Sequence, residues 1–541
     1  MPNESRLSFP RTLLASVSAC VFVFVVFTIP NRLVFLDAKT FFYLPLELFV
    51  LGLGLLLPGK AGAVLRIALA LVLAAGLVFR IADMVAFEVF SRPFNPVFDS
   101  YLLADGYHFL STSLGRSGAM LAAVFALALV LAILWFSLLS LRRLQGFLRG
   151  APRVSLLCLL AGTVLWSALS LSGWPRASRY FIDQLSMHVS NTLRSVADLH
   201  AFRAVVNVDP YADASGASLF SALRGKDVLV VFVESYGRTL VDKAEYAADF
   251  RPALEEAAAQ LREAGYQSRS AFLGSPTVGG ISWLAHGTAL SGLWIDSQVR
   301  YDSLLMSERA SLMQLFQRAG WRTVGVMPAI GLPWPEGQYF GYEQLYTAPE
   351  LDYRGLPFNY VTMPDQFTLS RFQQLERARE DRAPVMAEIA LISSHAPWTP
   401  VPRLIDWERV GDGSIFNAQA TSSESAEQVW QDRDRVLRQY RECAEYVIDT
   451  LVSYVRHYGD ENLVMLVLGD HQPMPYVTDN TDNRDVLTHI IARDPAVMRA
   501  IESWQWTPGM LPAEDAPVWR MDALRDRFIS AFSSPVLSTP D

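Results

Sequence analysis

Long apolar runs separated by short polar breaks fill the first third of the chain. Five of these runs approach the ~20 residues that a helix needs to cross the hydrocarbon core of a bilayer. They cover residues 13–29, 41–57, 61–79, 119–139 and 154–171. The pattern predicts an α-helical membrane domain of five transmembrane helices over residues 1–173.

Arginines predict how this membrane domain is oriented. Residues 141–153 contain four arginines and no acidic residue, and short basic segments of this kind face the cytoplasm. Counting spans from there places the N-terminus inside and everything after residue 171 outside. Thr28-Ile29-Pro30 is a poor signal-peptide cleavage site, so we expect the first run to be retained. The predicted location is the cell (inner) membrane, multi-pass, with the C-terminal part facing the periplasm or the extracellular side.

Residues 174–225 predict a juxtamembrane amphipathic helix followed by a linker. Apolar residues such as Phe181, Leu185 and Val189 recur at helical spacing, which is typical of a helix lying along a membrane surface. Residues 209–225 are rich in Ala, Ser, Gly and Asp, as linkers are.

Two features of the membrane domain leave alternatives open. The aromatic stretch 81–118 is consistent with a structured element at the outer surface and with a plain connector. Glu47 lies inside the second apolar run, where an ionisable group is a functional candidate by default. Its position is equally consistent with a helix end.

Beyond residue 226, short apolar runs alternate with helical patterns up to residue 541. The runs 228–233, 268–272, 323–326, 385–392 and 463–468 predict strands, with a last strand over 486–492. Helical periodicity covers residues 253–264, 283–290, 307–319 and 426–457. Continuous apolar strands between helices predict a parallel sheet covered on both faces, an α/β sandwich. Reactive groups of such folds collect at the carboxyl ends of the strands.

Composition narrows the range of partners. The 541 residues are 51% hydrophobic and 18% charged, with a formal net charge of -8 and a mean hydropathy of +0.21. The absence of a basic surplus argues against nucleic acid as a partner. Cys20 and Cys158 fall in apolar runs, so Cys443 alone remains in the soluble part and no intramolecular disulfide is possible there.

Two predicted strands end in side chains suited to a metal ion. Glu234 follows the run 228–233, and Asp470 and His471 follow the run 463–468. Carboxylate oxygens with one imidazole nitrogen suit a single divalent ion such as Mn²⁺, Mg²⁺ or Zn²⁺. Each residue taken alone is also typical of a cap or a surface position.

Ser282 stands where a helix begins, after the tight turn that Gly279 and Gly280 permit. A hydroxyl there faces unpaired backbone N–H groups and the positive end of the helix dipole, and beside a metal ion it is a usable nucleophile. The alternative is that Ser282 is only the N-cap. His286 lies one turn further on the same helix face, so it either touches the nucleophile or packs as an ordinary helical histidine.

These residues resemble the alkaline phosphatase and sulfatase superfamily. Sulfatases carry a basic residue four positions after the nucleophile and a Thr-Gly pair at nine and ten, and His286 and Ser291-Gly292 keep that spacing from Ser282. The chain order of Glu234, Ser282, Asp470 and His471 after five spans resembles lipoteichoic acid synthases and related membrane phosphoglycerol transferases. The resemblance implies a sulfatase-type α/β fold in which Ser282 is the nucleophile and a fourth ligand of one metal ion.

Two further segments resemble the substrate-binding parts of these transferases. His395, in the stretch Ser393–Trp398, corresponds to a histidine that contacts the phosphate group, which implies that it assists the leaving oxygen. Trp334 precedes a Phe-Gly-Tyr segment as in the synthases, but Glu336 stands where they carry an arginine. The carboxylate of Glu336 suits head-group hydroxyls or an ammonium group.

The resemblance implies a membrane-anchored phosphotransferase. It would move a phospho-head group, phosphoglycerol first, from a membrane phospholipid to a glycan or lipid-linked acceptor through a covalent Ser282 intermediate. One alternative is a phosphoethanolamine transferase, in which a histidine near Asp485 and His489 binds metal or substrate; the missing disulfides argue against it. Further alternatives are a sulfatase-like hydrolase or phosphodiesterase and a non-catalytic sensor that kept the fold.

Overall fold

The computed structural model of the protein describes residues 5–90, 93–96, 99, 102–172, 174, 177–331, 334–422 and 424–534. The chain forms two compact units, and each is described by itself. The first consists of Met1–Glu88 and Arg92–Leu199, and the second of Val89–Ser91 and His200–Asp541. The predicted boundary at residue 173 lies outside the described residues, as does Arg176.

The first unit is helical. Its helices are α1 (Ser5–Thr28), α2 (Leu46–Leu55), α3 (Gly59–Phe90), α4 (Leu102–Gly150), α5 (Pro152–Leu171) and the start of α6 (Tyr180–Val205), with two short paired strands, β1 (Leu44–Pro45) and β2 (Ala177–Ser178). Among the described residues, three helical stretches are long and apolar enough to cross a membrane. They are Gly59–Glu88, Gly106–Gly150 and Pro152–Leu171. The prediction of five spans is not confirmed. In place of the first two predicted spans, only the shorter apolar helical stretches Ala15–Thr28, within α1, and Leu46–Leu55 are found among the described residues.

Two segments predicted as loops are largely helical. Helix α3 continues to Phe90 and α4 already begins at Leu102, so helix covers most of the stretch 81–118. The arginine-rich stretch 141–153 is the end of α4 and the start of α5, with Ala151 between them. Pro152 sits in the first turn of α5, a position that tolerates its missing N–H.

Glu47 lies in the first turn of α2 rather than in the middle of a span. Its side chain is buried, and Oε1 accepts a hydrogen bond from the backbone N–H of Ile182 in α6 at 3.0 Å. A buried pair also joins helices α3 and α6, with Oδ2 of Asp83 2.9 Å from Nε2 of His188. These polar contacts fasten α6 to the other helices of the unit.

The second unit is built on one nine-stranded sheet. Its strands are β3 (Asp227–Val233), β4 (Gln267–Gly274), β5 (Arg322–Met327), β6 (Gln344–Thr347), β7 (Val385–Leu391), β8 (Leu463–Gly469), β9 (Asp485–Ala492), β10 (Thr507–Pro508) and β11 (Val518–Arg520). The spatial order is β10-β4-β9-β8-β3-β7-β5-β6, with β11 beside β4. Strands β8, β3, β7, β5 and β6 are parallel, as predicted.

The expectation of a wholly parallel sheet is wrong at β9, which runs antiparallel to both β8 and β4. The connection from β8 to β9 contains one four-residue helix, α18 (Pro475–Thr478). This segment does not form the helical crossover that parallel neighbours require, so the chain turns back.

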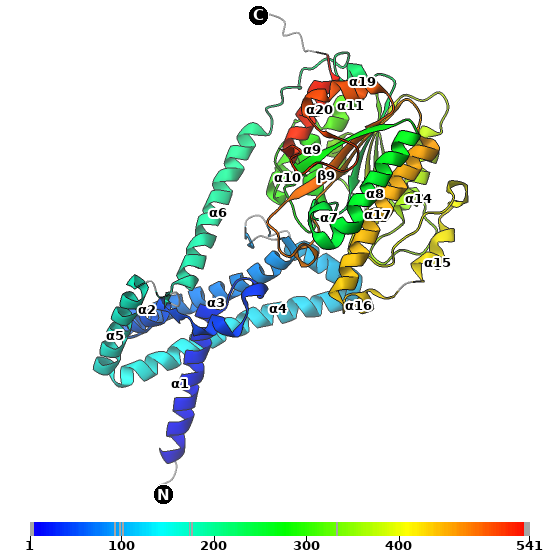
Figure 1. The fold of residues 1–541 in the computed structure, drawn as a ribbon. Helices are drawn as coiled ribbons and strands as arrows, with labels where there is room; N and C mark the ends of the chain where they lie inside the picture. The colour runs from blue at the N-terminus through cyan, green and yellow to red at the C-terminus, as the bar shows by residue number, and fades with distance from the viewer. Residues whose placement is uncertain are drawn as a thin grey trace, which may run out of the picture. The chain divides into compact units, whose positions relative to one another are not determined.

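Helices cover both faces of this sheet (Figure 1). On one face, α8 (Ala244–Glu263) and α17 (Arg433–Tyr458) pack against each other and share a core with Leu229, Val231 and Val233 of β3. The alternate β3 residues face the core of α9 (Ser282–Ser291), α11 (Leu312–Arg318) and α20 (Leu524–Phe532). The other helices are α7 (Thr239–Asp242), α10 (Gln298–Leu305), α12 (Gly337–Phe340), α13 (Ala348–Leu351), α14 (Asp365–Phe372), α15 (Asn417–Ala420), α16 (Ala426–Val429) and α19 (Pro495–Ala500).

Candidate active site

The register of the central strands brings two distant carboxylates to one edge of the sheet. Val233 of β3 lies opposite Gly469 of β8, so the next residues, Glu234 and Asp470, follow at the same level. The backbone N–H of Asp470 donates to the carbonyl of Val233 at 3.3 Å. The structure thus brings together the carboxylates that the sequence places at strand ends.

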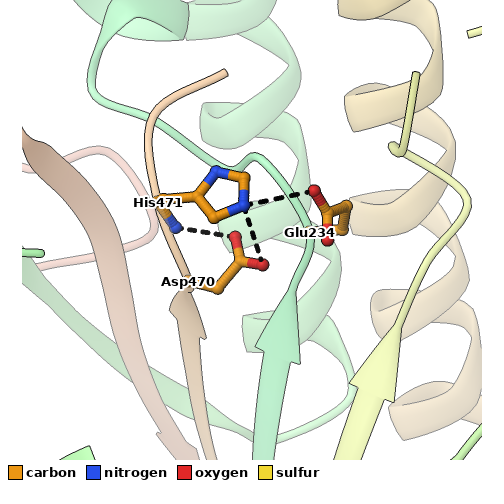
Figure 2. Close-up of side chains that lie close together, drawn as sticks. All are labelled: Glu234, Asp470 and His471. Atoms are coloured by element: carbon orange, nitrogen blue, oxygen red, sulfur yellow. Dashed lines mark hydrogen bonds and ion pairs between the residues drawn. The ribbon is translucent and has the colours of Figure 1, made fainter. Parts of the chain in front are cut away.

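His471 forms a buried cluster with these carboxylates (Figure 2). One ligand atom from each of Glu234, Asp470 and His471 lies within 4.8 Å of the others. Nε2 of His471 is 3.4 Å from Oε1 of Glu234 and 3.5 Å from Oδ2 of Asp470. Nδ1 lies 2.8 Å from the carbonyl oxygen of Gln472, and since a carbonyl only accepts, Nδ1 carries the proton. In the neutral imidazole, Nε2 then presents a lone pair to the cluster.

Backbone and hydroxyl donors fix both carboxylates. Oδ1 of Asp470 accepts hydrogen bonds from the backbone N–H groups of Ser235 at 2.8 Å and of His471 at 2.7 Å. The hydroxyl of Ser235 donates to Oε1 of Glu234 at 2.9 Å. Ser235 adopts a left-handed conformation (φ 57°), which bends the chain directly after Glu234.

The turn before α9 delivers Ser282 to this cluster. Gly279, Gly280 and Ile281 all have positive φ, at 73°, 150° and 63°. Ser282 is the first helical residue, and its Oγ lies 3.2 Å from Oε2 of Glu234 and 3.2 Å from Nε2 of His471. The alternative that Ser282 serves only as the N-cap is wrong, because Ile281 occupies that position and Oγ is turned to the cluster.

The two carboxylates titrate very differently. Burial by itself raises the pKa of Glu234, but the neighbouring His471 and His395 outweigh burial and lower that pKa to about 2. Burial and the charge of Glu234 raise the pKa of Asp470 to about 6, although His471 and His286 act against this rise. Burial lowers the pKa of His471, but Asp470 and Glu234 raise it overall. Negative charge at this site is therefore only partly neutralised by the imidazole.

The donor set fits a divalent cation. Two carboxylates and the lone pair of an imidazole converge within ligand distance of one another. Among the described residues, neither the largely buried Glu234 nor the buried Asp470 has an arginine or lysine partner, so their charge lacks a fixed counter-charge of that kind. A bound metal ion would supply that counter-charge.

His395 reaches the same site from the loop after β7. The hydroxyl of the preceding residue, Ser394, donates to the carbonyl of Glu234 at 2.5 Å, which ties this loop to the end of β3. The indole N–H of Trp398 donates to the carbonyl of Ser394 at 2.7 Å. His395 itself is exposed, and its charge helps to lower the pKa of Glu234 after that of His471. An exposed imidazole beside the cluster is accessible to a substrate.

His286 is held by a carboxylate that sequence reasoning missed. Its Nδ1 lies 2.6 Å from Oε1 of Glu388, and its ring stacks on Phe232 with centroids 3.8 Å apart. Glu388 lies in the middle of β7 and is 1% exposed. One acidic residue inside the apolar run Val385–Leu391 was the available signal, since a buried acid requires a partner.

The segment with Trp334 and Glu336 is linked through Tyr342 to the pair formed by His286 and Glu388, and not to the carboxylate–imidazole cluster. Trp334 is half-buried and packs against Phe340 and Tyr342, with centroids 5.8 and 6.4 Å away. The hydroxyl of Tyr342 donates to Oε2 of Glu388 at 2.5 Å. Glu336 is exposed, and no contact joins it to Glu234, Asp470 or His471 in the described part of the chain.

Asp485 and His489 lie in β9 and have structural partners. Oδ2 of Asp485 pairs with Arg238 at 3.1 Å. His489 is completely buried, with Nε2 2.9 Å from the hydroxyl of Tyr236 and Nδ1 2.6 Å from the hydroxyl of Ser270. Burial lowers the pKa of His489 to about 3. Both ring nitrogens are thus engaged within the core.

The turn that carries Ser282 and the carboxylate–imidazole cluster thus meet at one edge of a helix-covered α/β sheet. The sulfatase family model matches residues 226–511, more than half of the chain, so the protein belongs to the sulfatase family. No curated protein matches the sequence.

Several solved structures are similar to this chain. They include the lipoteichoic acid synthase LtaP from Listeria monocytogenes (13% identity, covering 63% of this chain and 78% of that one, TM-score 0.39). The phosphoglycerol transferase GacH from Streptococcus pyogenes matches at 10% identity, covering 62% and 90%, with a TM-score of 0.34. The C-terminal periplasmic domain of EcEptC from Escherichia coli, in complex with Zn, matches at 12% identity, covering 49% and 72%, with a TM-score of 0.32. The family assignment rests on the family model.

Proposed function

We propose that the protein is a membrane-anchored, metal-dependent phosphotransferase. It would move a phospho-head group, phosphoglycerol first, from a membrane phospholipid to a hydroxyl of a glycan or lipid-linked acceptor. The observation that carries this proposal is the position of the Ser282 hydroxyl, 3.2 Å from both Glu234 and His471. A serine so placed beside a buried acidic cluster is arranged as a nucleophile rather than as a structural cap.

The helical unit supports a lipid as the donor. Three apolar helices long enough to cross a bilayer precede the catalytic unit in the chain. Anchoring an active site to a membrane raises the effective concentration of lipid at that site. Among the described residues, one candidate span, Pro152–Leu171, follows the arginine-rich end of α4, and the positive-inside rule then supports a catalytic unit outside the cytoplasm.

In the first half-reaction, Ser282 Oγ attacks the phosphorus of the lipid head group. Its proton moves along the hydrogen bond to Glu234 and passes on to water. The bond from phosphorus to the diacylglycerol oxygen breaks, and protonated His395, exposed beside the cluster, protonates that oxygen. The backbone N–H groups at the start of α9 face the phosphoryl oxygens.

In the second half-reaction, an acceptor hydroxyl attacks the phosphorus of the Ser282 adduct and gives its proton to a general base, while Oγ leaves and takes up a proton from water. The residues that would hold the metal ion are Glu234, Asp470, His471 and Ser282. A divalent cation bound there would lower the pKa of the serine hydroxyl and stabilise charge on the phosphoryl oxygens. Mn²⁺, Mg²⁺ and Zn²⁺ all suit this set of ligands.

Phosphoethanolamine is a second candidate head group, and the exposed carboxylate of Glu336 beside Trp334 favours it. An ammonium group pairs with a carboxylate and stacks on an indole ring, whereas glycerol does neither as strongly. A hydrolase or phosphodiesterase would use the same first half-reaction with water as the acceptor.

One assay separates these candidates. Purified protein is incubated with Mn²⁺ and vesicles of phosphatidylglycerol or phosphatidylethanolamine that carry a labelled head group, with and without a glucose oligosaccharide. We expect diacylglycerol release and label on the oligosaccharide, and neither with Ser282→Ala. Release of free labelled head group only would identify a hydrolase, and no release from either lipid would contradict the proposal.

A further inference from the structure

His286 sits one turn after the nucleophile and makes no contact with the metal-binding cluster. Residues four apart on a helix have Cβ atoms about 5–6 Å apart on the same face, so this imidazole lies beside the position of a phosphoryl group on Ser282. The described residues give His286 one hydrogen-bond partner, Glu388. Its Nε2 makes no hydrogen bond with these residues.

Glu388 sets which nitrogen of His286 carries the proton. An ionised carboxylate only accepts hydrogen bonds, so the 2.6 Å contact places the proton on Nδ1. In the neutral imidazole Nε2 then has the lone pair. A histidine oriented by a buried carboxylate next to a nucleophile is the arrangement expected of a general base.

The position of Glu388 is fixed from several directions. Tyr342 donates to its second oxygen at 2.5 Å. Gly325 lies opposite Glu388 in the register of β5 and β7, and a Cβ there would come within 3.1–3.2 Å of the Tyr342 ring. The missing side chain of Gly325 thus makes room for the tyrosine. Phe232 stacks on the imidazole ring of His286 and so holds that ring in place.

A buried acid in a sheet core is expensive, and a packing role would not require one. Placing an ionised carboxylate in an apolar interior costs several kcal/mol unless it is fully paired. A second unusual group lies nearby, because the buried hydroxyl of Tyr301 has no hydrogen-bond partner among the described residues and its pKa is raised by burial and by Glu388. Glu388 and Tyr301 thus put two buried polar groups in this region, more than packing alone requires.

We propose that His286, oriented by Glu388 and Tyr342, accepts the proton of the acceptor hydroxyl in the second half-reaction. This inference rests on the proposed function. The acceptor O–H bond breaks and its proton goes to Nε2, the acceptor oxygen forms a bond to phosphorus, and the bond from phosphorus to Ser282 Oγ breaks. His286 then returns its proton to water, from which His395 is recharged. His286 is the catalytic residue, and Glu388 and Tyr342 position it.

Separating the two half-reactions tests this role. Labelled phosphatidylglycerol vesicles without acceptor load Ser282, and a glucose oligosaccharide then discharges the adduct. We expect His286→Gln to load within about threefold of the unchanged protein and to discharge at least about 100-fold more slowly, the usual range for a lost general base.

Two further variants keep the test decisive. Glu388→Gln leaves the shape of the side chain but no longer fixes the tautomer, so it should slow discharge at least about tenfold with loading unchanged. The control is His457→Gln, which removes an exposed histidine and should change neither step. Equal discharge in all variants, or equal loss of loading and discharge in His286→Gln, would overturn the inference. Failure of the unchanged protein to load Ser282 would overturn the proposed function itself.

Discussion

The hydroxyl oxygen of Ser282 lies 3.2 Å from Nε2 of His471, although 189 positions separate them in the chain. Each reaches this point by a different route, Ser282 from the first turn of α9 and His471 from the end of β8. Their meeting point is the edge of the sheet at which parallel strands end, where α/β folds place their reactive groups.

Replacing the nucleophile should abolish transfer without unfolding the protein. We expect Ser282→Ala to lower head-group transfer by on the order of 10³-fold or more, because no other hydroxyl occupies this position. Its unfolding free energy should stay within about 0.5 kcal/mol, since the side chain makes no helix-capping bond. Ser282→Thr keeps a hydroxyl and should retain measurable transfer. Labelled-lipid assays and thermal unfolding measure the two effects, and an active alanine variant would contradict the account.

Metal binding should stabilise the protein through Asp470. An ion at 100 times its Kd adds about 2.7 kcal/mol to stability, which corresponds to several degrees in Tm. We expect Mn²⁺ or Zn²⁺ to raise the Tm of chelator-treated protein and to leave that of Asp470→Asn unchanged. Differential scanning calorimetry in detergent gives both values. An equal increase in the two proteins would show that the ion binds elsewhere.

The start of β3, the strand that leads to Glu234, depends on a network of ion pairs around Arg377. Arg377 is 1% exposed and donates to Asp227, the first residue of β3, at 3.0 Å and to Asp460 at 2.7 Å. Arg377→Gln removes one of the two arginine partners of the buried Asp227 and leaves Arg382 in place, so the lost charged hydrogen bonds should cost about 2 kcal/mol. The exposed pair of Arg435 and Glu424 provides the control, because Arg435→Gln should cost at most about 1 kcal/mol. Chemical denaturation compares the two variants, and equal losses would contradict the prediction.

Acid should destabilise the protein through His489. Burial lowers its pKa to about 3 in the folded protein, whereas the unfolded chain has an ordinary value near ~6.5. Between these values the unfolded state binds more protons, so stability falls as pH falls from about 6.5 to 3, by up to about 5 kcal/mol in total. We expect the Tm of His489→Gln to drop less between pH 7.5 and pH 5 than the Tm of the unchanged protein.

The exposed His457 gives the matched control for this pH dependence. His457→Gln should show the same drop in Tm as the unchanged protein, because its side chain is already in contact with solvent. An equal drop in the His489 and His457 variants would mean that burial of His489 is not the cause.

Strand ends were predictable from the sequence because apolar runs are local signals. The run before Glu234 and the run before Asp470 mark two neighbouring strands, and their parallel register brings the carboxylates together. Glu388 was missed because its role depends on His286 and Tyr342, which lie 102 and 46 positions away. Such a contact is a property of tertiary packing and has no local pattern beyond one acid in an apolar run.

The helical unit shows where local patterns mislead. Apolar runs mark α3, α4 and α5 but do not give their lengths, since the polar residues of 81–90 and 141–150 continue the same helices. Polar breaks predict loops, whereas helices end where backbone hydrogen bonds cannot be continued. The pair of Asp83 and His188 illustrates the point, because polar residues within these helices serve contacts between them.

The most direct test of the central claim is a mass measurement on Ser282. The protein is incubated with Mn²⁺ and phosphatidylglycerol vesicles in the absence of an acceptor, quenched in acid and digested, and the peptide containing Ser282 is analysed by tandem mass spectrometry. The account predicts a glycerol phosphate group on the Ser282 oxygen, which disappears when a glucose oligosaccharide is added before quenching. Head-group release with Ser282 unmodified at every time point, or an adduct on a different residue, would contradict it.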